Sequence, residues 1–313
     1  MKSDGNHIAQ DQNSERSLKL QMAKEHLYAL ASRVQLTQGL IPAANAAVWL
    51  IVLPLKPDLR VWSVLLAFLI PIVDLILLDP LQKKWKLIAA KVQELFDCDV
   101  LHLPWNGFKI GERPTEETIA EHARKYRRKQ MTNAHLPDWY TFQFEDLPYQ
   151  AATVICQRSN CWWDSQLRRT YSWILLSSVS VIGISCVVYG IVAKASVEQF
   201  VLALIAPISP FIMWAVKESR LQEATATNSE RVLASVNQVW TNVCEKQKGV
   251  QTLDHDSRML QDEIFARRSV APVNPSWLYF FKRNDYQKLM VEGGQQLIER
   301  YRRSRNVPGR QRT

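Results

Sequence analysis

The chain has 313 residues, with 39 Lys and Arg against 30 Asp and Glu, a net charge of +9 and a mean hydropathy of −0.18. With 47% hydrophobic and 22% charged residues, this composition excludes an intrinsically disordered chain, a collagen-like chain and a small disulfide scaffold. The five cysteines form no even, closely spaced framework, so they are most simply reduced thiols. The averages describe a soluble protein, but the apolar residues are concentrated in four long runs.

A polar segment comes first and is predicted to form a helix that leads into a membrane segment. Apolar side chains recur at helical spacing over residues 15–38. Residues 1–33 contain neither an apolar core nor a small-residue cleavage site. We therefore expect no cleavable signal peptide.

Two apolar runs follow and are predicted to form a transmembrane hairpin. Residues 39–55 carry no charge, and residues 61–78 are interrupted only by Asp74. Because roughly 20 helical residues cross a hydrocarbon core of about 30 Å, both runs are marginal in length. A backbone in lipid must satisfy its own hydrogen bonds, so both runs should be helices, and the short link makes them antiparallel.

Three residues of this hairpin, Asn45, Pro71 and Asp74, are candidates for a pore or a gate. A carboxylate costs about 2.5–3.5 kcal/mol at the bilayer centre, so Asp74 should face protein or water. It could line a cavity, or it could snorkel and pair with Lys83 or Lys84. The Asn45 amide could line a cavity or bond another helix.

The segment between the hairpins is predicted to be cytoplasmic and mostly helical. An apolar stripe over 82–97 indicates a packed helix, and the alternating pattern of 97–106 favours a short strand or an extended segment. Residues 115–130 begin with acids and end with bases, as a helix dipole favours. The basic end could bind an acidic ligand or could be a solvated helix end. Its weak candidates for ligand binding are Arg124, Arg127 and Arg128.

A second hairpin is predicted from the runs 171–193 and 197–216, of which the first carries no charge. Buried helices of a globular protein share this apolarity, but they are rarely apolar on all faces. Pro207 and Pro210 each remove a backbone donor near the middle of the last run. The resulting kink could act as a gate or could be a simple bend.

Beyond the second hairpin, a long helix is expected over 217–249 and another from Ser276 to about Arg303. The expected fold class is mainly α: a polytopic membrane protein with two transmembrane helical hairpins and an α-rich cytoplasmic region that contains minor β structure. The predicted divisions are an N-terminal helix (1–38), hairpin 1 (39–79), a middle region (80–170), hairpin 2 (171–216) and a C-terminal helical region (217–313).

The distribution of basic residues predicts the orientation. Lys and Arg are concentrated next to the residues where the chain enters and leaves each hairpin, whereas the two hairpin tips hold only Lys56, Arg60 and Lys194. The positive-inside rule therefore places both termini and the middle region in the cytoplasm. Since the membrane accounts for the positive charge, we expect a lipid bilayer as a partner and no binding of DNA or RNA.

The sequence contains little that indicates catalysis. It lacks a phosphate-binding Gly-rich loop before Lys-Ser/Thr, a dinucleotide fingerprint, a His-Glu-x-x-His motif and a Gly-x-Ser-x-Gly motif. Cys156 and Cys161 lack a second pair of ligands for zinc. Glu94, Asp97 and Asp99 could hold a metal, but scattered acids near a helix end are usually structural. We expect no metal, no cofactor and no enzyme activity.

Two sequence blocks carry a resemblance to a known family. The first is ELFDCDVLHLPWN, directly after hairpin 1, and the second is ICQRSNCWWDSQLRR, just before hairpin 2. With the two hairpins, they resemble the SMODS-associated four-helix effector family, S-4TM, over nearly the whole chain. The positions that match are Asp97, Leu103, Pro104, Trp105, Arg158, Asn160 and Asp164. We expect these positions to be juxtamembrane folding or gating elements, and the candidates for a juxtamembrane switch are Asp97, Asp99, Trp105, Arg158, Asn160 and Asp164.

The resemblance implies a pore-forming effector of a bacterial anti-phage system, activated by a cyclic oligonucleotide from a nucleotidyltransferase and located in the inner membrane. Four helices are too few for a wide pore, so a homo-oligomer is expected. The alternatives are a membrane-anchored enzyme acting on nucleotides or lipid and a non-permeating membrane sensor or scaffold. The enzyme would use the carboxylates at positions 94, 97 and 99 with Arg158 and Asp164.

Overall fold

The computed structural model describes residues 6–129, 136–142, 146–246 and 250–306, and within these ranges every regular element is a helix. The elements are α1 (Ile8–Asp11), α2 (Glu15–Leu55), η1 (Pro57–Leu59), α3 (Arg60–Val73), η2 (Asp74–Leu78), α4 (Asp79–Val100), α5 (Gly107–Ile110), α6 (Glu116–Arg128), α7 (Tyr149–Val192), α8 (Val197–Phe200), η4 (Val201–Ile205), α9 (Ala206–Lys246), α10 (Val250–Val270) and α11 (Ser276–Asn306). The mainly α fold predicted from the sequence is confirmed.

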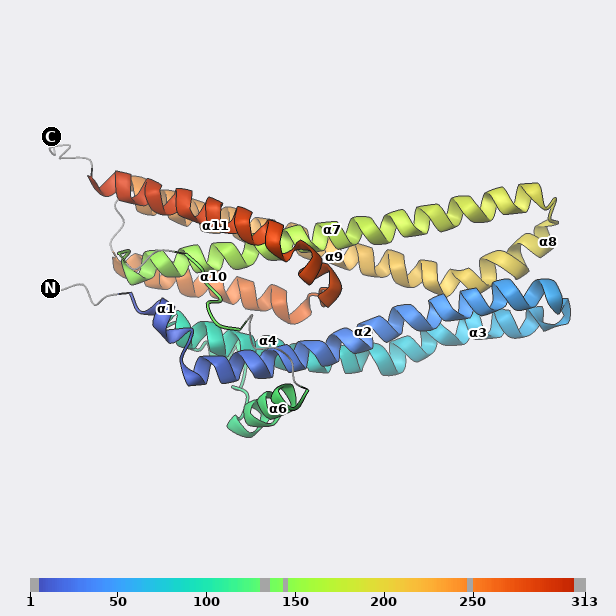
Figure 1. Cartoon of the computed structure of the whole chain (residues 1–313), viewed down its shortest axis with the longest axis horizontal. Coiled ribbons are helices and arrows are strands. Elements are labelled where there is room, and N and C mark those ends of the chain that lie inside the picture. Colours follow the sequence, from blue (N-terminus) through green and yellow to red (C-terminus); the bar gives the residue numbers. More distant parts are fainter. Residues whose placement is uncertain (1–5, 130–135, 143–145, 247–249, 307–313) are drawn as a thin grey trace.

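Four long helical rods form the frame of the molecule (Figure 1). α2 and α7 are two of them, and the others are built from consecutive segments, α3–η2–α4 and α8–η4–α9. The turns between α2 and α3 and between α7 and α8 lie at one end, and α1 and the end of α11 lie at the other (Figure 1). The rods therefore form two antiparallel hairpins side by side.

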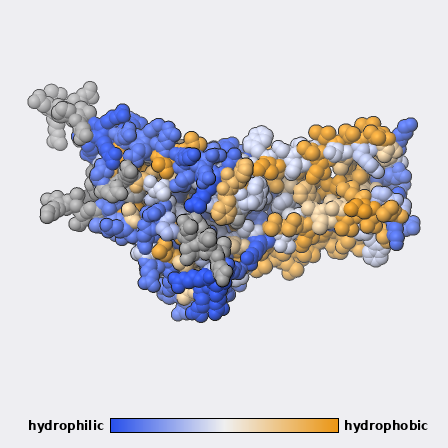
Figure 2. Space-filling view, in the orientation of Figure 1, coloured by the Kyte–Doolittle hydropathy of each residue, from blue (hydrophilic) through white to orange (hydrophobic). Residues whose placement is uncertain are grey.

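The surface divides into an apolar half and a polar half (Figure 2). The half that contains the two hairpin tips is mostly hydrophobic, and its exposed side chains include Leu55, Phe68, Ile184 and Val192. Four helices are long and apolar enough to cross a membrane. Large apolar side chains exposed on every rod are stable in lipid and not in water, so this half is the membrane-spanning part of a multi-pass protein.

The two hairpins approach closely inside the apolar half. A Cβ atom at Gly39 of α2 would lie 2.6 Å from the Trp214 ring of α9, well inside van der Waals contact. The absent side chain lets the indole pack directly on the α2 backbone, which is how small residues bring membrane helices together. Gly39 therefore fixes the spacing between the first and second hairpins.

The polar half has a large hydrophobic core of its own. The rods continue into it and are joined there by α10 and α11, and Phe96, Ile155, Trp240 and Ile298 are among the buried side chains. All five cysteines are free and buried. α6 packs on the outside of α2 (Figure 1).

The expected strand at 97–106, the minor β structure, is wrong. α4 continues to Val100, and His102 ends it with a positive φ of 45°. Val92, Phe96 and Val100 are all buried, so a helical spacing of four residues carries the apolar stripe on into the core. Burial by tertiary packing thus outweighs the local alternation. α10 was not anticipated from the sequence, and α7 begins at Tyr149, well before the apolar run 171–193.

Candidate functional site: polar networks at the base of four apolar helices

Asp74 lies at the start of the π-helical turn η2, between α3 and α4. Its Oδ1 accepts a hydrogen bond from Gln38 Nε2 at 2.7 Å, and its Oδ2 lies 3.7 Å from Lys217 Nζ. The carboxylate thus faces α2 and α9. Neither Lys83 nor Lys84 pairs with it among the described contacts, and Lys83 binds Asp79 at 2.6 Å. That Asp74 lines a pore stays a prediction.

Two of the other pore candidates, Pro71 and Pro207, lie close to interruptions of regular helix geometry. Asn45 Nδ2 donates to the Pro207 carbonyl at 3.0 Å, so it links α2 to α9. η4, a second π-helical turn, ends two residues before Pro207, just as η2 begins three residues after Pro71. Such turns interrupt the regular hydrogen-bond ladder and are common at functional sites. Pro210 lies inside α9, and a gating role for these prolines stays a prediction.

A buried polar cluster, here called the junction hub, lies where the rods pass from the polar half to the apolar half. Its side chains come from all four rods and gather around the loop 271–275 between α10 and α11. We define the hub as Gln35, Gln82, Lys86, Arg168, Glu218, Gln222 and this loop. All six side chains are buried.

The backbone of Val273 is the centre of the hub. Gln35 of α2 binds it twice: Nε2 donates to the Val273 carbonyl at 2.8 Å, and Oε1 accepts from the Val273 N–H at 2.9 Å. Gln82 Nε2 donates to the same Oε1 at 2.7 Å. Glu218 Oε1 accepts from Gln35 at 2.9 Å and from Gln222 at 2.8 Å.

α7 binds the same loop, and α4 binds the residue just before it, each through a longer side chain. Arg168 of α7 donates to the Pro272 carbonyl at 2.8 Å and to Gln222 Oε1 at 2.7 Å. Lys86 of α4 donates to the Val270 carbonyl, at the end of α10, at 2.9 Å. Since buried polar groups are costly unless they are paired, the hub holds the four rods and the loop in one arrangement.

Asp164 extends the hub along α7. It accepts from Arg168 Nε at 2.8 Å and from Ser229 Oγ at 3.0 Å, and it also pairs with Arg267 of α10. Burial alone would raise the pKa of Asp164, but the charges of Arg168 and Arg267 lower it below its ordinary value. The group is therefore an ionised anchor between α7, α9 and α10.

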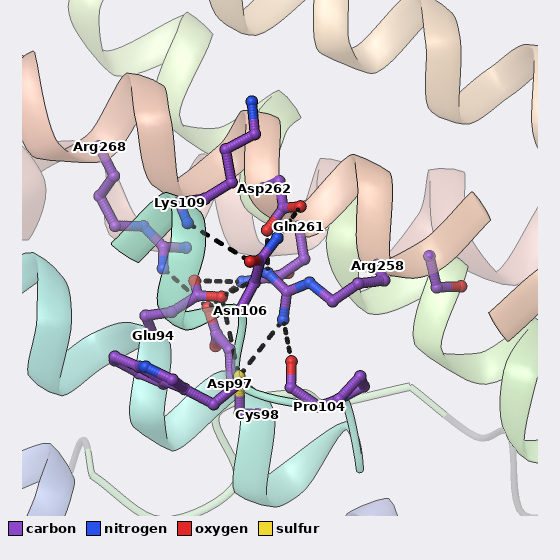
Figure 3. A network of polar contacts seen from close by, with 12 residues as sticks. Glu94, Asp97, Cys98, Pro104, Asn106, Lys109, Arg258, Gln261, Asp262 and Arg268 are labelled. Carbon is purple, nitrogen blue, oxygen red and sulfur yellow. Dashed lines mark hydrogen bonds and ion pairs between the residues drawn. The ribbon is translucent and has the colours of Figure 1, made fainter. Parts of the chain in front are cut away.

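A second network holds α10 against α4 (Figure 3). Glu94 and Asp97, both fully buried, point from α4 towards Arg258, Gln261 and Arg268 of α10. Arg258 binds Glu94 at 2.8 Å and Arg268 binds Asp97 at 2.7 Å, while Gln261 Nε2 donates to both carboxylates at 2.8 and 3.0 Å. Burial would lower the pKa of Arg268, but the Asp97 charge raises it. Each buried acid is thus matched by a cation.

The other juxtamembrane candidates divide between the networks and the surface. Asn160 reaches Asp97 indirectly, because its Nδ2 donates to Tyr140 Oη at 3.0 Å and that hydroxyl donates to Asp97 at 3.3 Å. Asp99 instead pairs with exposed Arg16 at 2.7 Å. Trp105 Nε1 donates to the Gly111 carbonyl at 3.0 Å.

Arg158 lies apart from both networks. Its Nε donates to Asn237 Oδ1 of α9 at 3.0 Å. Arg158 and Asp164 are therefore not brought together as the enzyme alternative would need.

A cavity of about 410 Å³ lies beside α6 and is lined by His26, Leu30, Trp85, His122, Lys125, Arg128 and Lys129. The Nδ1 atoms of His26 and His122 are 2.8 Å apart, so one donates and the other accepts. Burial lowers the pKa of His26 to about 4 and also lowers that of His122, so both rings are neutral at pH 7. Lys125 pairs with Glu121 at 2.5 Å. Among the described residues, no carboxylate forms an ion pair with Arg128 or Lys129.

Of the three basic residues singled out on α6, only Arg128 lines this cavity. Arg124 is exposed on α6, and Arg127 Nε lies against Met22 Sδ at 3.3 Å. The two histidines, Trp85 and the whole junction hub were missed from the sequence. Gln35, Gln82 and Gln222, buried glutamines within a few residues of an apolar run, were the available signal.

Comparison with known proteins fits this architecture. The sequence profile of the SMODS-associating 4TM effector domain matches residues 6–297. A protein of Bacillus cereus (strain VD146) described as a probable CBASS effector molecule is 23% identical over 208 residues, which is 65% of this chain and 67% of that protein. No solved structure matches. The residues matched by the profile, 6–297, include both hairpins, the junction hub and the network between α4 and α10. The chain therefore belongs to the SMODS-associating four-transmembrane effector family.

Proposed function

We propose that this chain is the membrane effector of a nucleotide-signalling anti-phage system. A cyclic oligonucleotide binds its cytoplasmic half, the chain assembles into homo-oligomers, and the assembly permeabilises the bacterial inner membrane. Family membership and the likeness to a probable CBASS effector support the signalling role. The bias of basic residues supports cytoplasmic termini.

The observation that carries this proposal is the junction hub. The loop binds side chains of α2, α7 and α9 directly. α4 is joined to it through Gln82, which bonds Gln35, and through Lys86, which bonds the end of α10, so a change in the position of α10 or α11 is transmitted to all four rods. A ligand that binds more tightly to a second arrangement of the cytoplasmic half, in which these hydrogen bonds have other partners, would move the rods to that second arrangement. A four-helix chain encloses no wide path, so the open state needs neighbouring copies.

The cavity beside α6 is the best candidate for the messenger site. Trp85 offers an aromatic surface for a base, and Arg128 and Lys129 offer cations for phosphate oxygens. α6 packs on α2, which runs on into the membrane. Binding there would therefore act on the first rod directly.

A matched pair of variants on α6 tests this site. Arg128→Glu reverses a charge at the cavity, whereas Arg124→Glu reverses an exposed charge on the same helix that does not line it. In calorimetry with synthetic cyclic di- and trinucleotides, we expect Arg128→Glu to abolish binding and Arg124→Glu to retain it. Equal affinities for the two variants would contradict the assignment.

The contacts of the carboxylates favour an effector over an anchored enzyme. Glu94 and Asp97 are buried and bound to arginines, and Asp164 is enclosed by Arg168 and Arg267. Acids held in this way are engaged in packing between helices and are not presented to a substrate.

The test in cells is expression with and without the cognate nucleotidyltransferase, monitored with a membrane-potential dye. We expect depolarisation and growth arrest only when both proteins are active. An unchanged membrane potential with stable binding of a partner protein would favour the non-permeating sensor instead.

A further inference from the structure

The first two turns of α11 carry an exposed aromatic strip. Trp277 and Phe281 are 55% and 73% exposed, and because they are four residues apart they lie on the same face of the helix. Lys282 Nζ lies 5.4 Å from the centre of the Phe281 ring, and Arg283 follows it. Exposing these aromatic side chains to water is unfavourable, so the position of the strip in the molecule indicates what it contacts.

The opposite face of the same turns fixes the depth of the strip. Leu278 is 1% exposed and packs in a cluster with Leu167, Tyr171, Leu175 and Ala215. Tyr171 opens the third apolar run, and Ala215 is the penultimate residue of the fourth. The start of α11 therefore lies level with the cytoplasmic ends of these runs, beside α7 and α9 (Figure 1).

An exposed aromatic side chain of α7 lies at a similar depth. Trp173, which lies two residues inside the third run, is 67% exposed on α7. Tryptophan and other aromatic side chains concentrate at the headgroup level of membranes. Lysine and arginine beside them are attracted to the anionic lipids of the cytoplasmic surface.

We propose that the strip formed by Trp277 and Phe281 is an interfacial anchor that inserts into the headgroup layer of an anionic bilayer surface, with Lys282 and Arg283 binding lipid phosphates. The inference rests on the membrane placement in the proposed function. α11 follows directly on the loop 271–275, so the anchor sets the height of the junction hub relative to the bilayer. The lipid surface thereby helps to position all four rods.

Spin-label depth measurements on the full chain test this proposal. A nitroxide is attached to Phe281→Cys and, as the matched control, to Gln296→Cys, an exposed position farther along α11. The protein is reconstituted in vesicles of phosphatidylcholine with phosphatidylglycerol. The unsubstituted chain, whose five cysteines are all buried, gives the labelling background.

We expect a severalfold higher ratio of oxygen to nickel-chelate accessibility at position 281 than at position 296. The double charge reversal Lys282→Glu with Arg283→Glu should lower that ratio at 281 in these vesicles. Equal ratios at the two positions would overturn the proposal, and an unchanged ratio after charge reversal would overturn the role of anionic lipid. Dipolar broadening at 281 would show that a second copy covers the strip, which also overturns it. Messenger-dependent depolarisation, measured separately, shows whether the proposed function fails with it.

Discussion

Replacing Gln35 with leucine removes the side chain that binds the loop 271–275 most extensively. The Val273 N–H and the Gln82 amide both donate to Gln35 Oε1, at 2.9 and 2.7 Å. Both groups lose this acceptor in Gln35→Leu. The Val273 carbonyl and Glu218 each keep a bond from Gln222, so they remain partly satisfied.

The expected loss of stability follows from those two orphaned groups. A buried donor left without an acceptor costs about 1–3 kcal/mol, so the variant should lose about 2–6 kcal/mol. Gln21 is the matched control: it lies on the same helix and is fully buried, but no described group bonds either amide atom. Gln21→Leu removes an unsatisfied amide and should be neutral or stabilising.

Urea titration of the two variants in lipid nanodiscs, followed by tryptophan fluorescence, measures the difference. With an m-value of about 2 kcal/mol/M, the midpoint of Gln35→Leu should fall by about 1–3 M, while that of Gln21→Leu should not fall. A Gln35→Leu midpoint equal to that of the parent chain would refute the reasoning. A fall of equal size in Gln21→Leu would refute it as well.

Three further predictions concern the helix contacts. Asp97→Asn breaks a buried ion pair and should lower the free energy of unfolding by about 3–5 kcal/mol, whereas Asp99→Asn breaks an exposed ion pair and should lower it by about 0–1 kcal/mol. The same urea titration compares the two variants, and equal losses would count against the buried network. Gly39→Ala places a methyl group against the Trp214 indole and should separate the hairpins, whereas in Gly183→Ala the added methyl group meets open space. The thermal midpoint of Gly39→Ala should therefore be lower than that of Gly183→Ala, and equal midpoints would contradict this reasoning. His26 and His122 bind protons more readily in the unfolded chain than in the folded one, so the docking of α6 should weaken as pH falls from about 6.5 towards 4. Hydrogen exchange of the α6 amides, corrected for intrinsic rates, tests this, and protection that does not change with pH would disprove it.

Features encoded by composition along the chain could be predicted from the sequence, and features made by contact could not. The four apolar runs predict four rods because lipid imposes helix on any spanning backbone. Asp74 was expected to face protein or water because a charge is costly in lipid. Gln261 and Arg268, which bind Asp97 from α10, are by contrast 164 and 171 positions away in the sequence, on a helix that was not anticipated.

The strand expected at 97–106 shows why local pattern fails. Alternation at Val100 and His102 is a signal of two or three residues, and the buried stripe of α4 outweighs it. The hub was missed for a related reason: its key atoms are the backbone N–H and carbonyl of Val273, which no sequence pattern distinguishes.

The central claim is that a cyclic oligonucleotide opens a path through the membrane formed by copies of this chain. The most direct measurement uses the purified chain in liposomes loaded with a self-quenching dye, to which the cyclic nucleotide that binds in calorimetry is added. We expect dye release that requires the nucleotide and is lost in Arg128→Glu but kept in Arg124→Glu. Full binding of the nucleotide with no release of dye or ions would contradict it.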